Sequence, residues 1–133
     1  MFTQYGTILL GEPDSDDAFF FNRTLQSAGY NNPVQVVHTG PEVISYLEGF
    51  NRFADRERYP FPSYVFLENY LPLLTGLEVL SKIPHFLSFV PFFLFVEDLD
   101  HTAREKASEL GVTATLMKPF RVQHLGILRE RTP

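Results

Sequence analysis

Two carboxylates and one lysine stand at comparable points along this sequence. Glu12, Glu68 and Lys118 each follow an apolar run that is short enough to be a strand. If these runs are parallel strands of one sheet, their carboxyl ends lie along the same edge, where open α/β folds bind ligands. Two carboxylates and an ammonium group gathered there form an acid-rich pocket, suited to ion pairing or to the chemistry of a small hydrolase.

The elements that carry these side chains alternate between short apolar runs and segments of helical periodicity. The expected strands cover residues 7–10, 34–37, 64–67, 92–96 and 114–117. The expected helices cover residues 14–28, 41–48, 76–83, 103–110 and 122–128, with a charged, proline-containing loop over 51–62. Strands that are apolar on both faces, alternating with helices, predict a doubly wound parallel α/β sheet covered on each side.

The composition indicates a single globular domain over residues 1–133. Of the 133 residues, 44% are hydrophobic and 20% are charged; none is cysteine, which excludes disulfides, thiolate catalysis and Cys-ligated metal sites. The net charge of −5 is the wrong sign for binding phosphate backbones. No apolar run approaches the ~20 residues of a membrane helix. We therefore expect a cytoplasmic protein with neither a nucleic-acid nor a membrane partner.

Two motifs resemble the receiver domain of response regulators, the CheY-like phosphorylation switch of two-component signalling. The stretch 68–72, followed by 75–80, is similar to the family's aspartate, two variable residues, apolar residue and proline, and then its glycine-containing helix start. Lys118-Pro119 is similar to the family's lysine-proline pair, and we expect a cis peptide bond there that aims the lysine into the pocket. The resemblance covers essentially the whole chain. It implies a flavodoxin-like, five-stranded sheet with strand order 2-1-3-4-5.

The resemblance also implies a chemistry, and three positions depart from it. A receiver accepts a phosphoryl group on an aspartate, with Mg²⁺ held partly by an acidic pair, and a hydroxyl and a lysine contact the phosphoryl oxygens. Here Pro13 replaces the second member of the acidic pair, Glu68 replaces the acceptor aspartate, and Val96 replaces the hydroxyl. A misplacement of ~1 Å can cost on the order of 100-fold in a positioned reaction. We therefore expect no catalytic residue, and Mg²⁺ binding that is weak or lost.

The remaining pocket residues are open to more than one interpretation. Lys118 is expected to pair with Glu68, an ion pair that either imitates part of the activated state or closes a dead site. Asp14 joins Glu12 in a remnant acidic pocket, although its spacing from Asp17 is typical of a helix N-cap followed by an acidic third residue. We interpret Asp16 and Asp17 as a solvated first turn.

Both residue positions of the family's conformational switch are altered in this sequence. Thr115 stands where the resemblance implies an aromatic switch residue, and Val96 stands where it implies the hydroxyl that moves with it. We interpret Thr115 as a residue chosen for its strand propensity. The four histidines show no metal-ligand spacing, so we predict no metal site.

These observations predict a degenerate receiver, or pseudo-receiver, that acts in signal transduction by phosphorylation-independent contact with another protein. The alternative is an atypical receiver that is still competent for phosphorylation, and a purely structural assembly module shares the same sequence features. A hydrolase is disfavoured because the sequence contains neither a Gly-x-Ser-x-Gly elbow nor a Gly-rich phosphate loop. The implied partner is a histidine kinase, a photoreceptor or a regulator.

Two surfaces are candidates for association, including formation of a homodimer. The first is the face made by the segments 103–110, 114–117 and 122–128. It presents charges of both signs, at Arg104, Glu105, Glu109 and Arg121, which suit either a self-complementary contact or an ordinary solvated surface. The second is an aromatic run, consisting of Phe86, Phe89 and Phe92.

Overall fold

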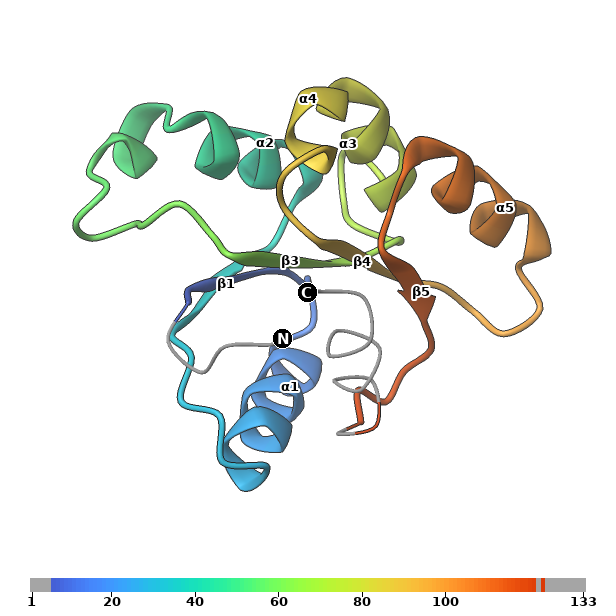
Figure 1. Cartoon of the computed structure of the whole chain (residues 1–133), viewed down its shortest axis with the longest axis horizontal. Helices are drawn as coiled ribbons and strands as arrows, with labels where there is room; N and C mark the ends of the chain where they lie inside the picture. Colours follow the sequence, from blue (N-terminus) through green and yellow to red (C-terminus); the bar gives the residue numbers. More distant parts are fainter. Residues whose placement is uncertain (1–5, 122, 124–133) are drawn as a thin grey trace.

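The five predicted strands form one parallel sheet. A computed structural model of the chain describes residues 6–121 and 123. Its strands are β1 (Ile8–Gly11), β2 (Val34–Val37), β3 (Tyr64–Glu68), β4 (Phe92–Phe95) and β5 (Ala114–Leu116). They are hydrogen-bonded in the order β2-β1-β3-β4-β5, which confirms the predicted topology (Figure 1). All strand carboxyl ends therefore lie along one edge of the sheet.

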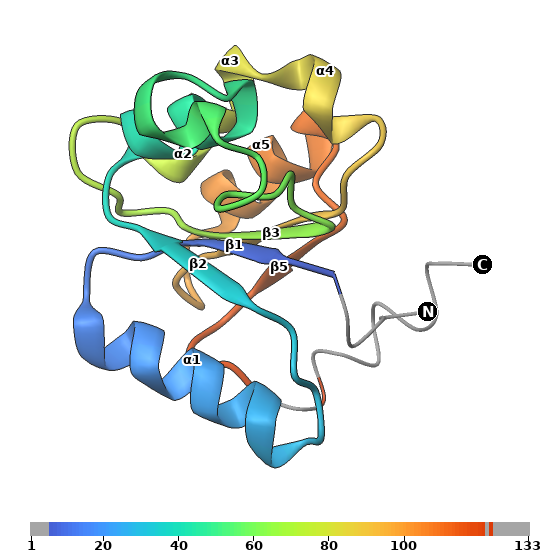
Figure 2. The same ribbon diagram turned by 90° about the vertical axis from the view of Figure 1, so that its left-hand side faces the viewer.

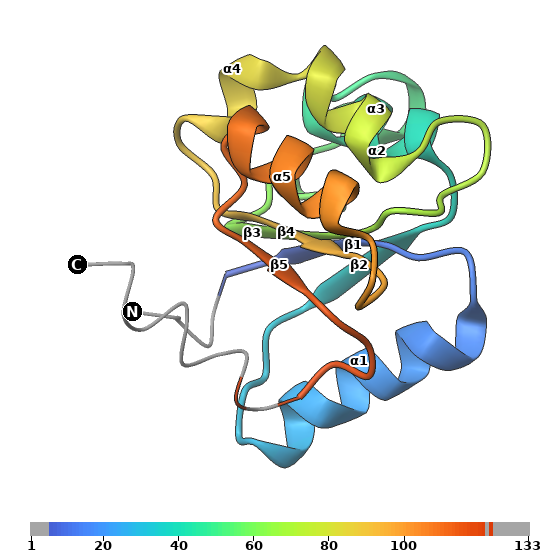
Figure 3. The same ribbon diagram turned by 90° about the vertical axis from the view of Figure 1, so that its right-hand side faces the viewer.

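Helices cover both faces of this sheet. They are α1 (Ser15–Ser27), α2 (Gly40–Glu48), α3 (Gly76–Lys82), α4 (Pro84–Leu87), α5 (His101–Leu110) and the short 3₁₀ helix η1 (Asn51–Ala54). Among these elements, α1 lies on one face, and α2, α3, α4 and α5 lie on the other (Figures 1 and 2). The helices α3 and α5 pack side by side (Figure 3). The helix expected over 122–128 lies, apart from position 123, outside the described residues.

The core is divided by the sheet into two layers, because successive strand residues point to opposite faces. Leu9 and Val65 belong to the layer beneath α2, α3 and α5, whereas Leu10 and Phe66 belong to the layer that packs on α1. Each of these four side chains is at most 1% exposed. Burial on both faces explains why the strands are continuous apolar runs in the sequence.

Local capping fixes the loops that surround the strand ends. The Asp14 side chain accepts hydrogen bonds from the backbone N–H groups of Asp16 and Asp17, and so starts α1 directly after β1. Thr75 and Glu78 form a capping box that starts α3 after β3. These caps hold the β1–α1 and β3–α3 loops in place at the edge of the sheet where ligands bind in such folds.

Two small elements and one buried ring differ from the sequence-based expectations. The predicted loop over 51–62 begins with η1, and α4 follows α3 after Ile83; both are too short to show periodicity. Phe92, which we expected in an exposed aromatic run, is a fully buried residue of β4. Phe61, from the segment before β3, instead contacts the rings of Phe86 and Phe89.

Candidate functional site

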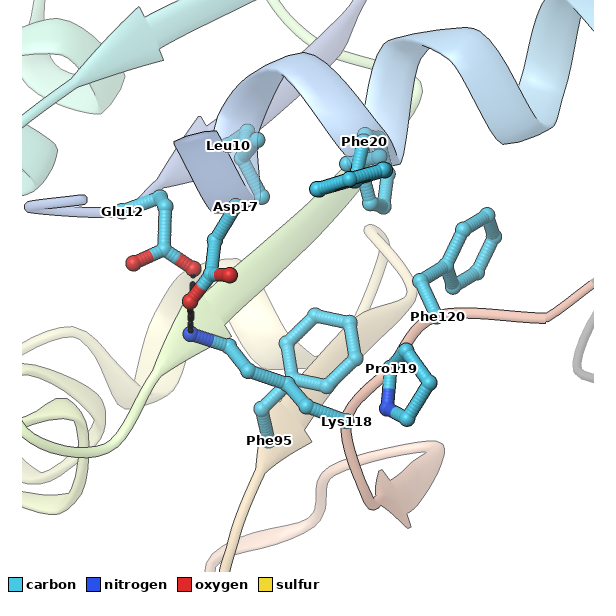
Figure 4. Close-up of a pocket in the computed structure, with 9 residues that line it drawn as sticks. Leu10, Glu12, Asp17, Phe20, Phe95, Lys118, Pro119 and Phe120 are labelled. Carbon is cyan, nitrogen blue, oxygen red and sulfur yellow. Dashed lines mark hydrogen bonds and ion pairs between the residues drawn. The ribbon is translucent and has the colours of Figure 1, made fainter. Parts of the chain in front are cut away.

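Three carboxylates surround the ammonium group of Lys118. Its Nζ lies 2.6 Å from Glu12 Oε1, 2.8 Å from Asp17 Oδ2 and 2.7 Å from Glu68 Oε1. Figure 4 shows Glu12 and Asp17 pointing toward the end of the Lys118 side chain. An ammonium group has three hydrogen-bond donors, so these three carboxylates account for all of them.

The topology of the sheet brings these residues together. Glu12 follows β1, Glu68 is the last residue of β3, and Lys118 lies two residues beyond β5. The meeting of Glu12, Glu68 and Lys118 at the carboxyl edge is as the sequence predicted. The Lys118-Pro119 peptide bond is cis, which was also expected.

The second oxygen of both glutamates is also hydrogen-bonded. Glu12 Oε2 accepts from the backbone N–H of Asp14 at 3.2 Å, and Glu68 Oε2 accepts from the backbone N–H of Tyr70 at 3.3 Å. The Glu12 side chain is only 3% exposed, compared with 14% for Glu68 and 30% for Lys118. Both oxygens of each glutamate are therefore satisfied by contacts within the protein, and Glu12 is the more deeply buried of the two.

Burial and ion pairing shift the pKa values of Glu12 and Lys118 in opposite directions. Burial raises the pKa of Glu12 above its ordinary value, and the hydrogen bond from Lys118 only partly offsets this effect. Burial alone would lower the pKa of Lys118, but its hydrogen bonds to Asp17, Glu12 and Glu68 outweigh that effect and raise it. Lys118 therefore stays charged at neutral pH.

Asp14 and Asp17 play different parts at the start of α1, and the sequence suggested only the first of them. Asp14 is the N-cap of α1, as its spacing from Asp17 suggested; its assignment to the acidic pocket is not confirmed, because the described contacts include no ion pair between it and Lys118. Asp17, which we interpreted as part of a solvated turn, instead pairs with Lys118. That interpretation of Asp17 was wrong. No local pattern marks this contact, because it depends on how α1 sits against the loop after β5.

Of the two altered switch positions, Val96 directly follows β4 and Thr115 lies within β5. Val96 is 5% exposed, and its backbone N–H donates to the carbonyl of Leu116 at 2.8 Å. Its side chain offers only methyl groups where the resemblance implied a hydroxyl. Thr115 is half-buried in β5 and pairs in register with Leu94 of β4.

Two hollows adjoin the Lys118 cluster. One is a small cavity of about 60 Å³ beside Glu12, and its walls are mostly apolar, formed by Leu10, Phe20, Phe21, Phe95, Pro119 and Phe120 (Figure 4). The other is an open groove of about 420 Å³ on the Glu68 side. It is lined by Tyr70, Val96, Glu97, Asp98 and Met117 together with Asp17, Glu68, Phe95 and Lys118.

Within residues 6–121 and 123, no group of three or more His, Cys, Asp or Glu side chains is arranged to hold a metal ion. The helices of this part of the chain are also too short or too polar to cross a membrane.

Neither a protein-family model nor a curated protein sequence matches this chain. Solved structures do match it. The bacteriophytochrome response regulator RtBRR is 28% identical, with a TM-score of 0.80, over 95% of this chain and 77% of that one. The bacteriophytochrome response regulator AtBRR is 26% identical, with a TM-score of 0.80, over 95% and 91% of the two chains. A response regulator in its Mn²⁺-bound form is 21% identical, with a TM-score of 0.74, over 90% and 86%.

The structural neighbours of this chain are thus response-regulator receiver domains. The sheet order and the surrounding helices are those of the flavodoxin-like receiver fold.

Proposed function

We propose that the chain is a degenerate receiver domain that acts in two-component signalling by phosphorylation-independent contact with another protein. The observation that carries this proposal is the pairing of the Lys118 ammonium with Glu12, Asp17 and Glu68 at 2.6 to 2.8 Å. A lysine that uses all three donors internally has none left for an incoming phosphoryl oxygen. The receiver neighbours support the signalling role.

The side chains around Glu68 also argue against phosphotransfer. Phosphoryl transfer depends almost entirely on positioning and on neutralising the charge that builds up on the phosphoryl oxygens. Glu68 extends its carboxylate one methylene further than an aspartate, and this carboxylate is already held by Lys118 and by the backbone of Tyr70. Val96 offers no hydrogen bond to a phosphoryl oxygen. Both substitutions remove interactions that the transfer requires.

The residues present do not fit a magnesium ion. Mg²⁺ demands near-octahedral oxygen ligation at about 2.0 to 2.1 Å, usually from one or two carboxylates and water. Here the ammonium of Lys118 stands where the carboxylates converge, and Pro13 has no side-chain oxygen to add. A divalent ion would have to displace Lys118, whose ion pairs already compensate the charge of the buried Glu12 carboxylate. We therefore assign no cofactor to the site and no enzymatic activity to the chain.

The function then lies in protein contacts. The partner is of the class that two-component pathways supply: a histidine kinase, a photoreceptor or a regulator, with a second copy of the chain as a further possibility. The bacteriophytochrome response regulators among the neighbours favour a partner in two-component signalling.

The proposal is tested by incubating the purified chain with acetyl phosphate and Mg²⁺ and measuring its intact mass. The wild type is expected to gain no phosphoryl group. The matched control is the triple variant Pro13→Asp, Glu68→Asp, Val96→Thr, which restores the three altered positions and is expected to gain one. If the wild type gains a phosphoryl group on Glu68, the chain is an atypical receiver that is still competent for phosphorylation. That result would reject the proposal of a degenerate receiver.

A further inference from the structure

Exposed apolar side chains line the groove on the Glu68 side of the site or lie next to it in the sequence. Tyr70 is 52% exposed and Met117 is 45% exposed, and both line the groove. Leu99 follows the groove residue Asp98 and is 82% exposed. Aromatic and long aliphatic side chains that stay open to solvent around a hollow are typical of a surface that a partner covers.

Most charges that face the same groove are negative. The carboxylates of Asp17, Glu68, Glu97 and Asp98 line it, against the single ammonium of Lys118. That ammonium already pairs with Asp17 and Glu68 inside the groove and with Glu12 behind it. Glu97 and Asp98 are exposed, and the described contacts include no ion pair between either of them and Lys118.

Arg104 is the other cation that reaches this region among the described contacts. Its Nη2 lies 3.5 Å from Asp98 Oδ1 and 3.5 Å from the backbone carbonyl of Glu97, so both contacts are at the long limit for a hydrogen bond. The Asp98 side chain remains 73% exposed. An exposed pair of this kind contributes at most about 1 kcal/mol, and a competing cation can replace it.

Tyr70 is close enough to the acidic residues of the groove to feel their charge. The Glu97 carboxylate is the main cause that raises the pKa of the Tyr70 hydroxyl, and Asp100 and Glu68 act in the same direction. The ring therefore stands in a negative field created by three carboxylates. An exposed aromatic face beside carboxylates is an environment that attracts a lysine ammonium or an arginine guanidinium.

We propose that this groove docks a polypeptide segment of a partner protein in which lysine or arginine side chains alternate with apolar ones. The cations would meet Glu97, Asp98 and the ring of Tyr70, and the apolar side chains would cover Leu99 and Met117. Charge complementarity selects this occupant, because an acidic segment would meet like charges in a groove whose only lysine is already paired. The inference deepens the proposed function: it names the chemistry of the partner at a site that no longer receives a phosphoryl group.

The test uses a short fluorescein-labelled peptide in which lysine and leucine alternate, titrated with the full chain and followed by fluorescence anisotropy. A peptide with glutamate in place of lysine is expected not to bind. The double variant Glu97→Gln, Asp98→Asn is expected to weaken binding of the lysine peptide about fivefold or more, from the loss of two exposed ion pairs. Tyr70→Ala is expected to weaken it about two- to fivefold through loss of the cation–π contact.

The matched control is the double variant Glu48→Gln, Glu57→Gln, which removes two exposed carboxylates elsewhere on the surface. It leaves the net charge equal to that of the groove variant, so it is expected to bind the lysine peptide like the wild type. The inference is overturned if the lysine peptide does not bind, if the glutamate peptide binds equally well, if both double variants lose the same affinity, or if Tyr70→Ala has no effect.

The two proposals fail separately. A chain that becomes phosphorylated and still binds the lysine peptide through the groove contradicts only the proposed loss of phosphotransfer. A chain that stays unphosphorylated and ignores the peptide contradicts only the docking inference.

Discussion

Asp17 accepts a hydrogen bond from Lys118 Nζ at 2.8 Å, although the two residues are 101 positions apart in the sequence. The contact ties the first turn of α1 to the loop after β5. Asp17 is 43% exposed, so its own pairing with Lys118 contributes little to stability. The contact that matters more energetically is the one with Glu12, whose side chain is almost completely buried and depends on Lys118 for its compensating charge.

Replacing Lys118 by methionine is therefore expected to destabilise the fold. Lys118→Met removes the cation and leaves the buried Glu12 carboxylate without a partner, which we expect to lower the free energy of unfolding by roughly 2 to 3 kcal/mol at neutral pH. Urea unfolding followed by far-UV circular dichroism measures the change. Lys106→Met, at an exposed position of α5, is the control and is expected to have little effect.

The pH dependence of the stability difference between Lys118→Met and the wild type tests whether the unpaired Glu12 carboxylate causes it. Burial already raises the pKa of Glu12, and loss of Lys118 removes an influence that lowers it. The folded variant therefore binds a proton at Glu12 more readily than the unfolded chain, whose carboxyl has the ordinary value of 4.5. The destabilisation should shrink as the pH falls toward that value. An equal loss of stability in the Lys106→Met control, or a loss that does not change with pH, would contradict this explanation.

Tyr46 is expected to make the fold sensitive to alkali. Its ring is fully buried and its hydroxyl donates to the carbonyl of Pro60 at 2.8 Å. Burial raises the pKa of Tyr46 from 10.0 to about 12, although the Arg56 guanidinium acts against it. Between these two values the unfolded chain loses the phenolic proton while the folded chain keeps it, so stability falls as the pH rises, by up to roughly 2 to 3 kcal/mol.

The variant Tyr46→Phe isolates this contribution. It loses the hydrogen bond to Pro60 and is expected to be about 1 kcal/mol less stable at neutral pH. Its free energy of unfolding in urea should fall less steeply between pH 10 and pH 12 than that of the wild type, because all other groups titrate in both proteins. Parallel slopes in the two proteins would show that burial of Tyr46 does not control the alkaline limit.

The sheet and most of the site were predictable because they depend on local patterns. Each strand is a short apolar run, and its bounds in the structure lie within one residue of the expected ones. Glu12, Glu68 and Lys118 follow such runs, so the parallel topology alone brings them to one edge. The cap at Asp14 also has a local signature, since its partners are the next residues of the same helix.

The features that the sequence did not reveal depend on contacts between distant segments. Asp17 has the same local signature whether it faces solvent or Lys118, and only the placement of α1 against the loop after β5 decides between the two. Phe92 and Phe89 are both phenylalanines of one aromatic run, yet one is fully buried in β4 and the other is 63% exposed. Phe61 joins that run in space from a loop nearly 30 positions earlier.

Three rings form an aromatic patch, defined here as Phe61, Phe86 and Phe89, of which Phe61 and Phe89 are exposed and Phe86 is half-buried. The ring centroids of Phe61 and Phe89 are 6.1 Å apart in a stacked arrangement, and Phe86 lies 5.8 Å and 5.9 Å from them. On the other candidate surface the described contacts are weaker, since an exposed pair such as Arg104 with Asp98 contributes at most about 1 kcal/mol. We therefore expect self-association of the chain to use the aromatic patch rather than the charged face that includes Arg104.

Sedimentation velocity over a range of protein concentrations tests this expectation. The wild type is expected to associate as its concentration rises, and the double variant Phe61→Ser, Phe89→Ser is expected to associate at least about 30-fold more weakly, since truncated aromatic anchors cost about 2 kcal/mol or more. Phe19→Ser changes an equally exposed phenylalanine on α1, on the opposite face of the sheet, and should behave like the wild type. Arg104→Glu should do the same. A wild type that stays monomeric at every concentration, or an Arg104→Glu variant that alone dissociates, would exclude the patch as the contact between copies.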